Sequence, residues 1–237
     1  MPPTTPAAAE QAVMVGSHHA GSGLDVASRR GGHWGSAIAL ELTRRGTEVL
    51  VIDESIKVVQ GISGHLTQVV AADCTDIGTL RELGVDEFYR AVVAVGTDIE
   101  ASILITSLLV ELEVEDVWAK AITAHHGRIL ERVGASHVVY PEREAGERVA
   151  HLVSGQLLDY LQVDDDFAIA KIRPPQPMVG LPLGDTNIRS KYGITVVAVK
   201  SGDTEFTYAS AETELAYDDT ILVTGRVNDI DRLVGLT

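Results

Sequence analysis

The residues that could do chemistry lie first in a glycine-rich stretch and in the acid that ends the hydrophobic run after it. Residues 31–53 read GGHWGSAIALELTRRGTEVLVID, in which a glycine-rich turn precedes an apolar helix predicted from about Ser36 to Arg45. A tight turn at a helix N-terminus lets backbone N–H groups approach a phosphate. Asp53 follows roughly 20 residues after the turn, where a carboxylate can accept hydrogen bonds from ribose hydroxyls. The spacing predicts nucleotide binding by the second half of a βαβ unit.

Two further polar residues follow the next predicted strand. Asp73 and Cys74 come after residues 68–72, at the edge of the sheet where open parallel folds bind ligands. Asp73 fits either a ligand site or a cap for the helix that begins near Thr75. Cys74 fits a small buried hydrophobe better than a reactive thiol. Asp53 also fits a simple strand-end cap, but the spacing of the whole stretch favours the ribose.

Hydrophobic runs alternate with helical segments through the first 143 residues. The runs that read as strands are residues 12–16, 48–53, 68–72, 91–95, 116–121 and 137–140. Helices are predicted between them, at residues 36–45, 54–61, 76–83, 97–111 and 125–133. The fourth helix opens on a sequence typical of a capping box, Thr97 to Glu100. This alternation predicts an α/β fold over residues 12–143, a Rossmann-like doubly wound parallel sheet with right-handed crossovers.

The first strand has two possible positions. Residues 12–16 read AVMVG, but the polar segment 17–30, SHHAGSGLDVASRR, separates them from the glycine turn and reads as a loop. In one register Gly16 is the first glycine of the nucleotide-binding turn, and an insertion precedes Gly32 and Gly35. In the other register, residues 24–28 form the strand. We prefer the first register, because LDVAS is short for a central strand.

The pattern changes after residue 143. A helix is predicted from about 144 to 162, and it is more amphipathic than a sheet-covering helix needs, so residues 144–163 are expected to form a crossover and interface helix. Residues 164–237 then read as a small α+β domain, with strands at 167–172, 194–199, 205–208 and 221–224 and helices at 188–192 and 227–234. A domain of this size is marginal alone, so dimerisation is expected.

Composition excludes several classes of protein. The 237 residues carry a net charge of −15, which disfavours a broad nucleic-acid surface. Residues are 45% hydrophobic and 5% aromatic, so the core must be aliphatic. The single cysteine rules out an internal disulfide framework and fits a reducing cytosol. Residues 1–11 read as a disordered tail. We find no signal peptide and no apolar run long enough to span a bilayer, so a cytoplasmic location is expected, with any membrane connection running through a partner.

Several separate blocks in the chain resemble one known family. These blocks are GHWGSAIALEL, EVLVID, AADCTD, VVAVG, HHGRILERVGASHVVYPE, NIRSKYGITVVAVK and DDTILVTG. In this order they resemble the cytosolic regulatory subunits of Ktr and Trk potassium-uptake systems, over about residues 32–236. Such subunits consist of an N-terminal RCK domain, also called KTN, and a smaller C-terminal RCK domain. The resemblance implies that the protein is not an enzyme but a nucleotide-sensing subunit that gates a membrane channel.

The resemblance also implies roles for particular residues. Asp53 would hold the adenosine ribose of ATP, ADP or NAD(H). The phosphates would lie over the glycine-rich turn, formed by Gly32, His33, Trp34 and Gly35. The adenine pocket would be walled by Asp73, Cys74, Val95 and Gly96. Glu142, in the YPE sequence, would lie near a divalent cation close to the terminal phosphate. Asn187 and Arg189 match a segment that binds cyclic di-AMP between two subunits in some members.

Two expectations follow for partners and chemistry. Similar proteins form octameric rings, built from dimers, under a membrane potassium channel. Where Ktr-type members usually carry arginine after the second glycine, this chain has His33, and an imidazole cannot replace the five donors of a guanidinium.

The alternative function is an NAD(H)-dependent oxidoreductase, which needs a proton-relay group near its cofactor. Tyr140 and Tyr192 stand in no such arrangement in the sequence.

Overall fold

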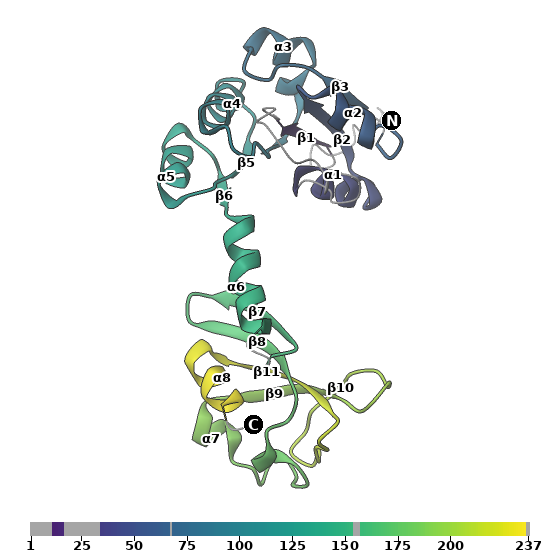
Figure 1. Ribbon diagram of the computed structural model, residues 1–237, viewed down its shortest axis with the longest axis vertical. Coiled ribbons are helices and arrows are strands. Elements are labelled where there is room, and N and C mark those ends of the chain that lie inside the picture. Colours follow the sequence, from purple (N-terminus) through teal and green to yellow (C-terminus); the bar gives the residue numbers. More distant parts are fainter. Residues whose placement is uncertain (1–10, 17–33, 67, 154–156, 236–237) are drawn as a thin grey trace, which may run out of the picture. The chain divides into compact units, whose positions relative to one another are not determined.

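The computed structural model describes residues 11–16, 34–66, 68–153 and 157–235. The chain divides into two compact units, Met1–Glu142 and Arg143–Thr237, and each contains one sheet (Figure 1). Of the predicted tail, Gln11 begins the first strand, and residues 1–10 lie outside the described part. Gly32, His33 and residues 17–30 also lie outside it.

The first unit is a six-stranded parallel sheet with the strand order β3-β2-β1-β4-β5-β6. Its strands are β1 (Gln11–Gly16), β2 (Glu48–Asp53), β3 (Gln68–Ala71), β4 (Arg90–Val93), β5 (Asp116–Lys120) and β6 (His137–Val139). Its helices are α1 (Trp34–Arg44), α2 (Ile56–Ile62), α3 (Ile77–Glu82), α4 (Ile99–Glu111) and α5 (Ala124–Val133), with a 3-10 turn at Val85–Glu87. This strand order is that of a doubly wound dinucleotide-binding fold, so the predicted fold class is confirmed.

The position of β1 settles which register holds. β1 pairs in parallel with β2 on one side and with β4 on the other, which makes it a central strand of the sheet. Ala12 to Val15 are each at most 1% exposed, as a strand covered on both faces requires. The register that begins the sheet at residues 12–16 is therefore confirmed. The rival strand at residues 24–28 lies outside the described part.

Both faces of the first sheet carry a hydrophobic core. Val13 and Val15 point into a cluster with Leu80 of α3 and Ile105 of α4. Met14, between the two valines, points to the other face, where it joins a cluster that includes residues of α1. Because alternate side chains enter two different cores, the strand is hydrophobic at every position. This is why the continuous apolar runs of the sequence predict buried parallel strands.

The second unit contains a five-stranded antiparallel sheet with the order β10-β9-β11-β8-β7. Its strands are β7 (Asp159–Asp164), β8 (Phe167–Ile172), β9 (Thr195–Lys200), β10 (Thr207–Tyr208) and β11 (Thr220–Arg226). Its helices are α7 (Ile188–Tyr192) and α8 (Val227–Val234), with a 3-10 turn at Gln176–Met178, and α6 (Pro141–Val153) leads into it from the first unit. One cluster packs Ile188 of α7 and Leu233 of α8 against the sheet.

The predicted helix over residues 144–162 is wrong in its second half. Helix α6 ends at Val153, and Asp159–Asp164 form β7, which pairs with β8. The leucines of this segment fit a helical spacing, but Tyr160 is 6% exposed and its neighbour Leu161 is 62% exposed. Leu161 to Asp164 are all exposed, and the segment is a strand because pairing with β8 supplies partners for its backbone.

One helix cap also differs from the prediction. The N-cap of α4 is Asp98, whose carboxylate accepts a hydrogen bond from the backbone N–H of Ala101 at 2.9 Å. The predicted capping box placed Thr97 in this role. Aspartate and threonine are both good N-cap residues, so the sequence alone could not choose between neighbours.

Candidate functional site

Two cavities lie at the carboxyl ends of the strands in the first unit, and Gly16 lines both of them. The lining of the first cavity includes Gly16, Trp34, Gly35, Asp53, Gly96 and Lys120. The lining of the second cavity includes Gly16, Glu54, Asp73, Cys74, Thr75 and Asp98. Parallel strands bring their carboxyl ends to one edge, so residues far apart in the sequence meet there. The structure thus brings most of the predicted nucleotide-site residues to this edge, whereas Val95 is fully buried in the core beside Gly96.

Gly16 and Asp53 face each other at the ends of neighbouring strands. They are paired in the register of β1 and β2, and a Cβ atom on Gly16 would stand 2.5 Å from Asp53 Oδ2. With the Asp53 side chain in this position, any larger residue in place of Gly16 would force the carboxylate to shift. Asp53 is 6% exposed, and its Oδ1 accepts a hydrogen bond from the Ser55 N–H at 2.8 Å. Asp53 therefore closes the turn after β2 and lines the cavity at the same time.

Gly35 lets helix α1 approach the sheet closely. It stands at the second position of α1, and a Cβ atom there would lie 2.7 Å from Cβ of Ala94, just after β4. A larger residue would push the start of the helix away from the strands. The helix N-terminus, whose first N–H groups have no partner within the helix itself, thus lies at the cavity, which is the geometry that suits a phosphate.

Asp73 is occupied with its own turn. Its Oδ1 accepts hydrogen bonds from the Thr75 N–H at 2.8 Å and from Thr75 Oγ1 at 2.6 Å. The N-cap of α3 is instead Asp76, which accepts from the Thr79 N–H. Asp73 is exposed at the rim of the second cavity, so the turn it closes leaves its side chain accessible to a ligand.

Cys74 is buried beside these acids. It is 3% exposed, and burial together with the negative charges of Asp73, Asp53 and Glu54 raises its pKa to about 12. Its thiol therefore stays protonated at neutral pH and is a poor nucleophile. The predicted burial of Cys74 is confirmed, and its contribution to the second cavity is a small apolar surface.

Lys120 is the functional candidate that the sequence analysis missed. It ends β5, its side chain is 10% exposed, and it lines the first cavity. Its Nζ atom lies 2.5 Å from Oε1 of Glu142, whose side chain is 65% exposed. The hydrogen bond and the charge of Lys120 lower the pKa of Glu142. A lysine that directly follows three apolar residues at the end of a strand was the signal available in the sequence.

Glu142 pairs with a lysine and does not belong to a cluster of acids in the described part of the chain. Within the described ranges, no group of three or more His, Cys, Asp or Glu residues could hold a metal ion. The one charged partner that the structure gives Glu142 there is Lys120. A single carboxylate cannot form a cation site by itself, so the predicted divalent cation needs further ligands from a nucleotide or another chain.

Asn187 and Arg189 lie at the start of α7 in the second unit. Asn187 adopts a left-handed backbone, with φ of 54°, and its side chain donates to the carbonyl of Asp185 at 3.2 Å. Arg189 lines an open cavity with Ile188, Thr195 and Ser210. The two predicted residues are thus near neighbours, and Arg189 supplies a cation to a mainly apolar hollow.

No helix in the described part of the chain is long and apolar enough to cross a membrane.

Family models match both units. A model of the TrkA-N domain matches residues 31–141, and a model of the TrkA-C domain matches residues 167–236. The first match begins after β1, although the structure places this strand at the centre of the sheet. The segment between β1 and α1 is therefore where this chain departs from the family pattern.

Two relatives match this chain over almost their full length. Ktr system potassium uptake protein C of Bacillus subtilis (strain 168) is 36% identical over 202 residues, which is 85% of this chain and 91% of the relative. Ktr system potassium uptake protein A of the same organism is 32% identical over the same shares of both chains. The crystal structure of the GsuK RCK domain is similar in fold, with a TM-score of 0.59 and 17% identity. That match covers 98% of this chain and about half, 48%, of the GsuK chain. With both domains matched and relatives of this identity, the chain belongs to the family of Ktr potassium-uptake proteins, as its sequence blocks predict.

Proposed function

We propose that the protein is a regulatory subunit of a potassium-uptake system and that an adenine nucleotide bound to its first unit sets its state. The observation that carries the proposal is the close approach of Gly16 to Asp53, beside Gly35 at the start of α1. A buried carboxylate at this edge can accept from ribose hydroxyls, while the glycines leave the backbone open to phosphates. The names of the relatives, which state potassium uptake, supply the process.

The proposed ligand is ATP, ADP or NAD(H), bound across the carboxyl edge of the first sheet. Its ribose bonds to Asp53, and its base lies in the second cavity, against Asp73 and Cys74. The strand end at Val95 and Gly96 would form a further wall, although Gly96 lines the first cavity and Val95 is buried. Its phosphates lie over Trp34 and Gly35 and the residues just before them. The second cavity offers carboxylates and a small apolar surface, which suits a sugar and a base better than a phosphate.

Two further ligands are part of the proposal. A divalent cation would bind Glu142 when a nucleotide supplies phosphate oxygens as additional ligands. Cyclic di-AMP would bind at Asn187 and Arg189, where a cation stands beside an apolar hollow in an otherwise acidic protein. Both sites would be completed by a second copy of the chain.

The subunit would act as an assembly of several copies under a membrane partner. Dimers would form an octameric ring in the cytoplasm, and the ring would gate a potassium channel without entering the membrane and without binding nucleic acid. Shifting a two-state ring from 1:99 to 99:1 requires about 5.5 kcal/mol of ligand preference for one state. Several nucleotide sites acting on one ring can share this free energy.

The alternative function, an NAD(H)-dependent oxidoreductase, lacks support at the site. Such an enzyme needs a group that moves a proton next to the cofactor. Among the described residues that line the two cavities there is no histidine and no tyrosine. Lys120 is already paired with a carboxylate. We therefore propose regulation rather than catalysis.

Thermal unfolding with candidate ligands tests the proposal. The full chain is heated alone and with ATP, ADP, NAD+, NADH or cyclic di-AMP, because a ligand that binds only the folded state raises stability. At a hundredfold excess over the dissociation constant the gain is about 2.7 kcal/mol. We expect at least one adenine nucleotide to raise the midpoint, and Asp86→Asn, an exposed acid outside both cavities, to leave that shift unchanged. Absence of a shift with every ligand would overturn nucleotide sensing. The ring is tested separately by light scattering, and a monomer at micromolar concentration would overturn it.

A further inference from the structure

Lys120 is a buried cation at the cavity that Asp53 lines. It is 8% exposed and stands at the end of β5, beside the glycines of the proposed phosphate path. Of the described residues around this cavity, Lys120 is the one with a positive charge. Keeping an ammonium group out of water is costly unless an anion compensates it. The position therefore calls for a negatively charged partner.

The charges around the two cavities are unevenly distributed. Glu54, Asp73 and Asp98 line the second cavity, whereas Lys120 and the single carboxylate of Asp53 line the first. Gly16 lines both and so marks the boundary between them. A polyphosphate would be repelled by the three carboxylates and attracted by the ammonium group. This asymmetry orients a nucleotide with its base in the second cavity and its phosphates toward Lys120.

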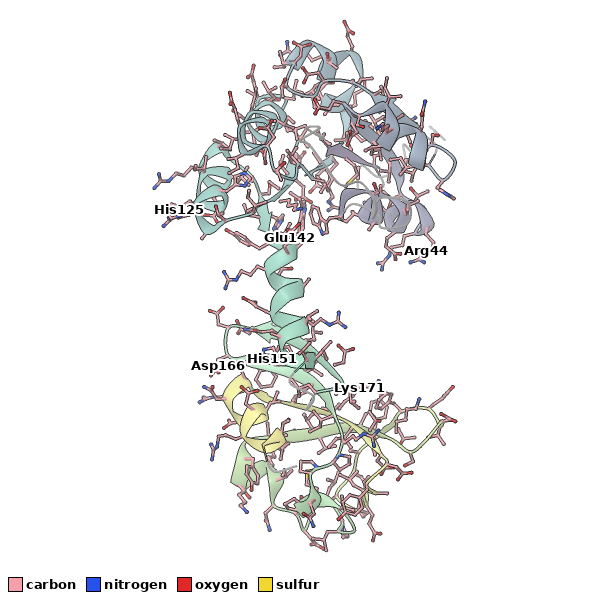
Figure 2. The ribbon with its side chains drawn as sticks, in the orientation of Figure 1. Arg44, His125, Glu142, His151, Asp166 and Lys171 are labelled. Carbon is pink, nitrogen blue, oxygen red and sulfur yellow. The ribbon has the colours of Figure 1, made fainter. Side chains whose placement is uncertain are left out.

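Lys120 already has a partner that can be replaced. Its Nζ lies 2.5 Å from Glu142 Oε1, and the two side chains differ greatly in exposure, 10% for the lysine and 65% for the glutamate. Figure 2 shows Glu142 at the start of α6. An exposed carboxylate returns to water at little cost, whereas the buried lysine must keep a counter-charge. An incoming phosphate can therefore take the place of Glu142.

We propose that Lys120 is the phosphate-binding cation of the nucleotide site and that Glu142 holds it when no nucleotide is bound. Phosphate and glutamate then compete for one ammonium group. This inference rests on the proposed nucleotide function and adds to it a ligand class, namely adenosine di- and triphosphates or dinucleotides rather than adenosine.

The competition gives the site a connection to the rest of the chain. Glu142 lies in the first turn of α6, the helix that leads from the first unit into the second. Further along α6, Arg148 pairs with Asp159 of β7 at 2.7 Å. A phosphate on Lys120 removes the ion pair between the first turn of this helix and the end of β5. Occupancy of the site is thus transmitted to the start of α6.

Calorimetric titration of the full chain in EDTA tests the inference. ATP and adenosine are titrated into the wild type, Lys120→Gln and Glu142→Gln. Arg128→Gln, an exposed cation on α5, is the matched control. EDTA removes divalent cations, so a metal-ligand role of Glu142 contributes nothing to the result.

We expect opposite effects of the two variants on ATP. Lys120→Gln should weaken ATP binding by about tenfold to a hundredfold, because a charge-assisted contact is lost, and leave adenosine within about twofold. Glu142→Gln should tighten ATP binding by about twofold to fivefold, because the competitor is removed. Arg128→Gln should change neither affinity.

Two results would overturn the inference while ATP still binds. One is an unchanged ratio of ATP to adenosine affinity in Lys120→Gln. The other is an equal or weaker ATP affinity in Glu142→Gln, a variant at an exposed position that should fold even if Lys120→Gln does not. Failure of the proposed function looks different, because then neither ATP nor adenosine binds the wild type, and the inference falls with it.

Discussion

The two sheets of this protein are covered in different ways. In the first unit, β1 and β2 are buried at consecutive positions, because helices pack on both faces. In the second unit, β8 and β11 alternate between buried and partly exposed residues, because their core packs on one face. A parallel sheet thus leaves only its edges for ligands, whereas an antiparallel sheet leaves a whole face.

The difference separates the proposed roles of the two units. The first concentrates glycines, acids and Lys120 at the carboxyl edge of its sheet. The second exposes large apolar side chains on β7 and β8, with Leu161 62%, Val163 59% and Phe167 44% exposed. We therefore expect the carboxyl edge of the first unit to bind the nucleotide and the exposed face of the second to contribute contacts between copies.

The largest effects should come from truncating side chains that lie in the hydrophobic cores of the two sheets. Met14→Ala and Leu50→Ala remove side chains from opposite faces of the first sheet, and each should cost about 2–5 kcal/mol of unfolding free energy. In the second sheet, Ile172→Ala should cost a similar amount, but Leu161→Ala less than about 1 kcal/mol. Urea unfolding measures all four. An equal loss at Leu161 and Ile172 would mean that the exposed face is covered in the folded assembly.

The next effect concerns the close approach of Gly16 to Asp53 at the carboxyl edge of the first sheet. Gly16→Ala places a methyl group against Asp53 Oδ2 and should lower the unfolding free energy by about 1–3 kcal/mol, with loss of nucleotide binding. Gly61→Ala is the matched control, because no atom lies within 4 Å of its added Cβ and α2 favours alanine. It should be neutral or slightly stabilising. If Gly16→Ala behaves like Gly61→Ala in thermal unfolding and in nucleotide binding, the close approach of Gly16 to Asp53 is not required for stability or for binding.

The chemical state of Cys74 gives a third test of that edge. A pKa of about 12, compared with the usual 9.0, leaves the folded thiol about a thousandfold less ionised at pH 8 than an ordinary cysteine. Iodoacetamide should therefore modify the folded chain very slowly and the urea-unfolded chain rapidly, as mass spectrometry can follow. Since the unfolded thiol ionises first, stability should also fall as the pH rises above about 9. Rapid labelling of the folded chain would show that the second cavity is open down to Cys74.

The smallest effect distinguishes an exposed ion pair from one in which only the cation is buried. Arg148 and Asp159 are about half exposed, so Arg148→Gln should cost less than about 1 kcal/mol, whereas Lys120→Gln removes a buried charge with larger consequences. Pairing lowers the pKa of both Asp159 and Glu142. Both carboxylates therefore stabilise the folded chain above their usual pKa values, and this contribution is lost as the pH falls below about 4. If the wild type and Arg148→Gln unfold at the same acid pH, pairing with Arg148 does not stabilise the folded chain through Asp159.

The sequence alone predicts the first unit well, because local patterns agree with its fold. Each apolar run between helical segments is a parallel strand, and the acid at residue 53 stands at the end of its strand as the spacing requires. The helix stops are also visible in the sequence, for example Gly134, whose positive φ of 107° closes α5.

The parts that sequence analysis missed depend on distant partners. Leu157, Leu158 and Leu161 suit a helix by their spacing, and only pairing with β8 makes the segment a strand. In the sequence Lys120 is only the end of a strand, because its partner Glu142 lies 22 residues further on, in α6. The contact of Gly16 with Asp53 likewise requires the register of two strands. Such long-range contacts are not encoded in local periodicity.

The central claim, that Asp53 holds the ribose of a bound nucleotide, is tested most directly by removing the hydroxyls it would bind. Calorimetry compares ATP with 2′,3′-dideoxy-ATP on the wild type and on Asp53→Asn, a variant that keeps an acceptor for the Ser55 N–H. We predict that the wild type prefers ATP by about tenfold or more and that Asp53→Asn loses this preference. Equal affinity of the wild type for both ligands, or an undiminished preference in Asp53→Asn, would contradict the account.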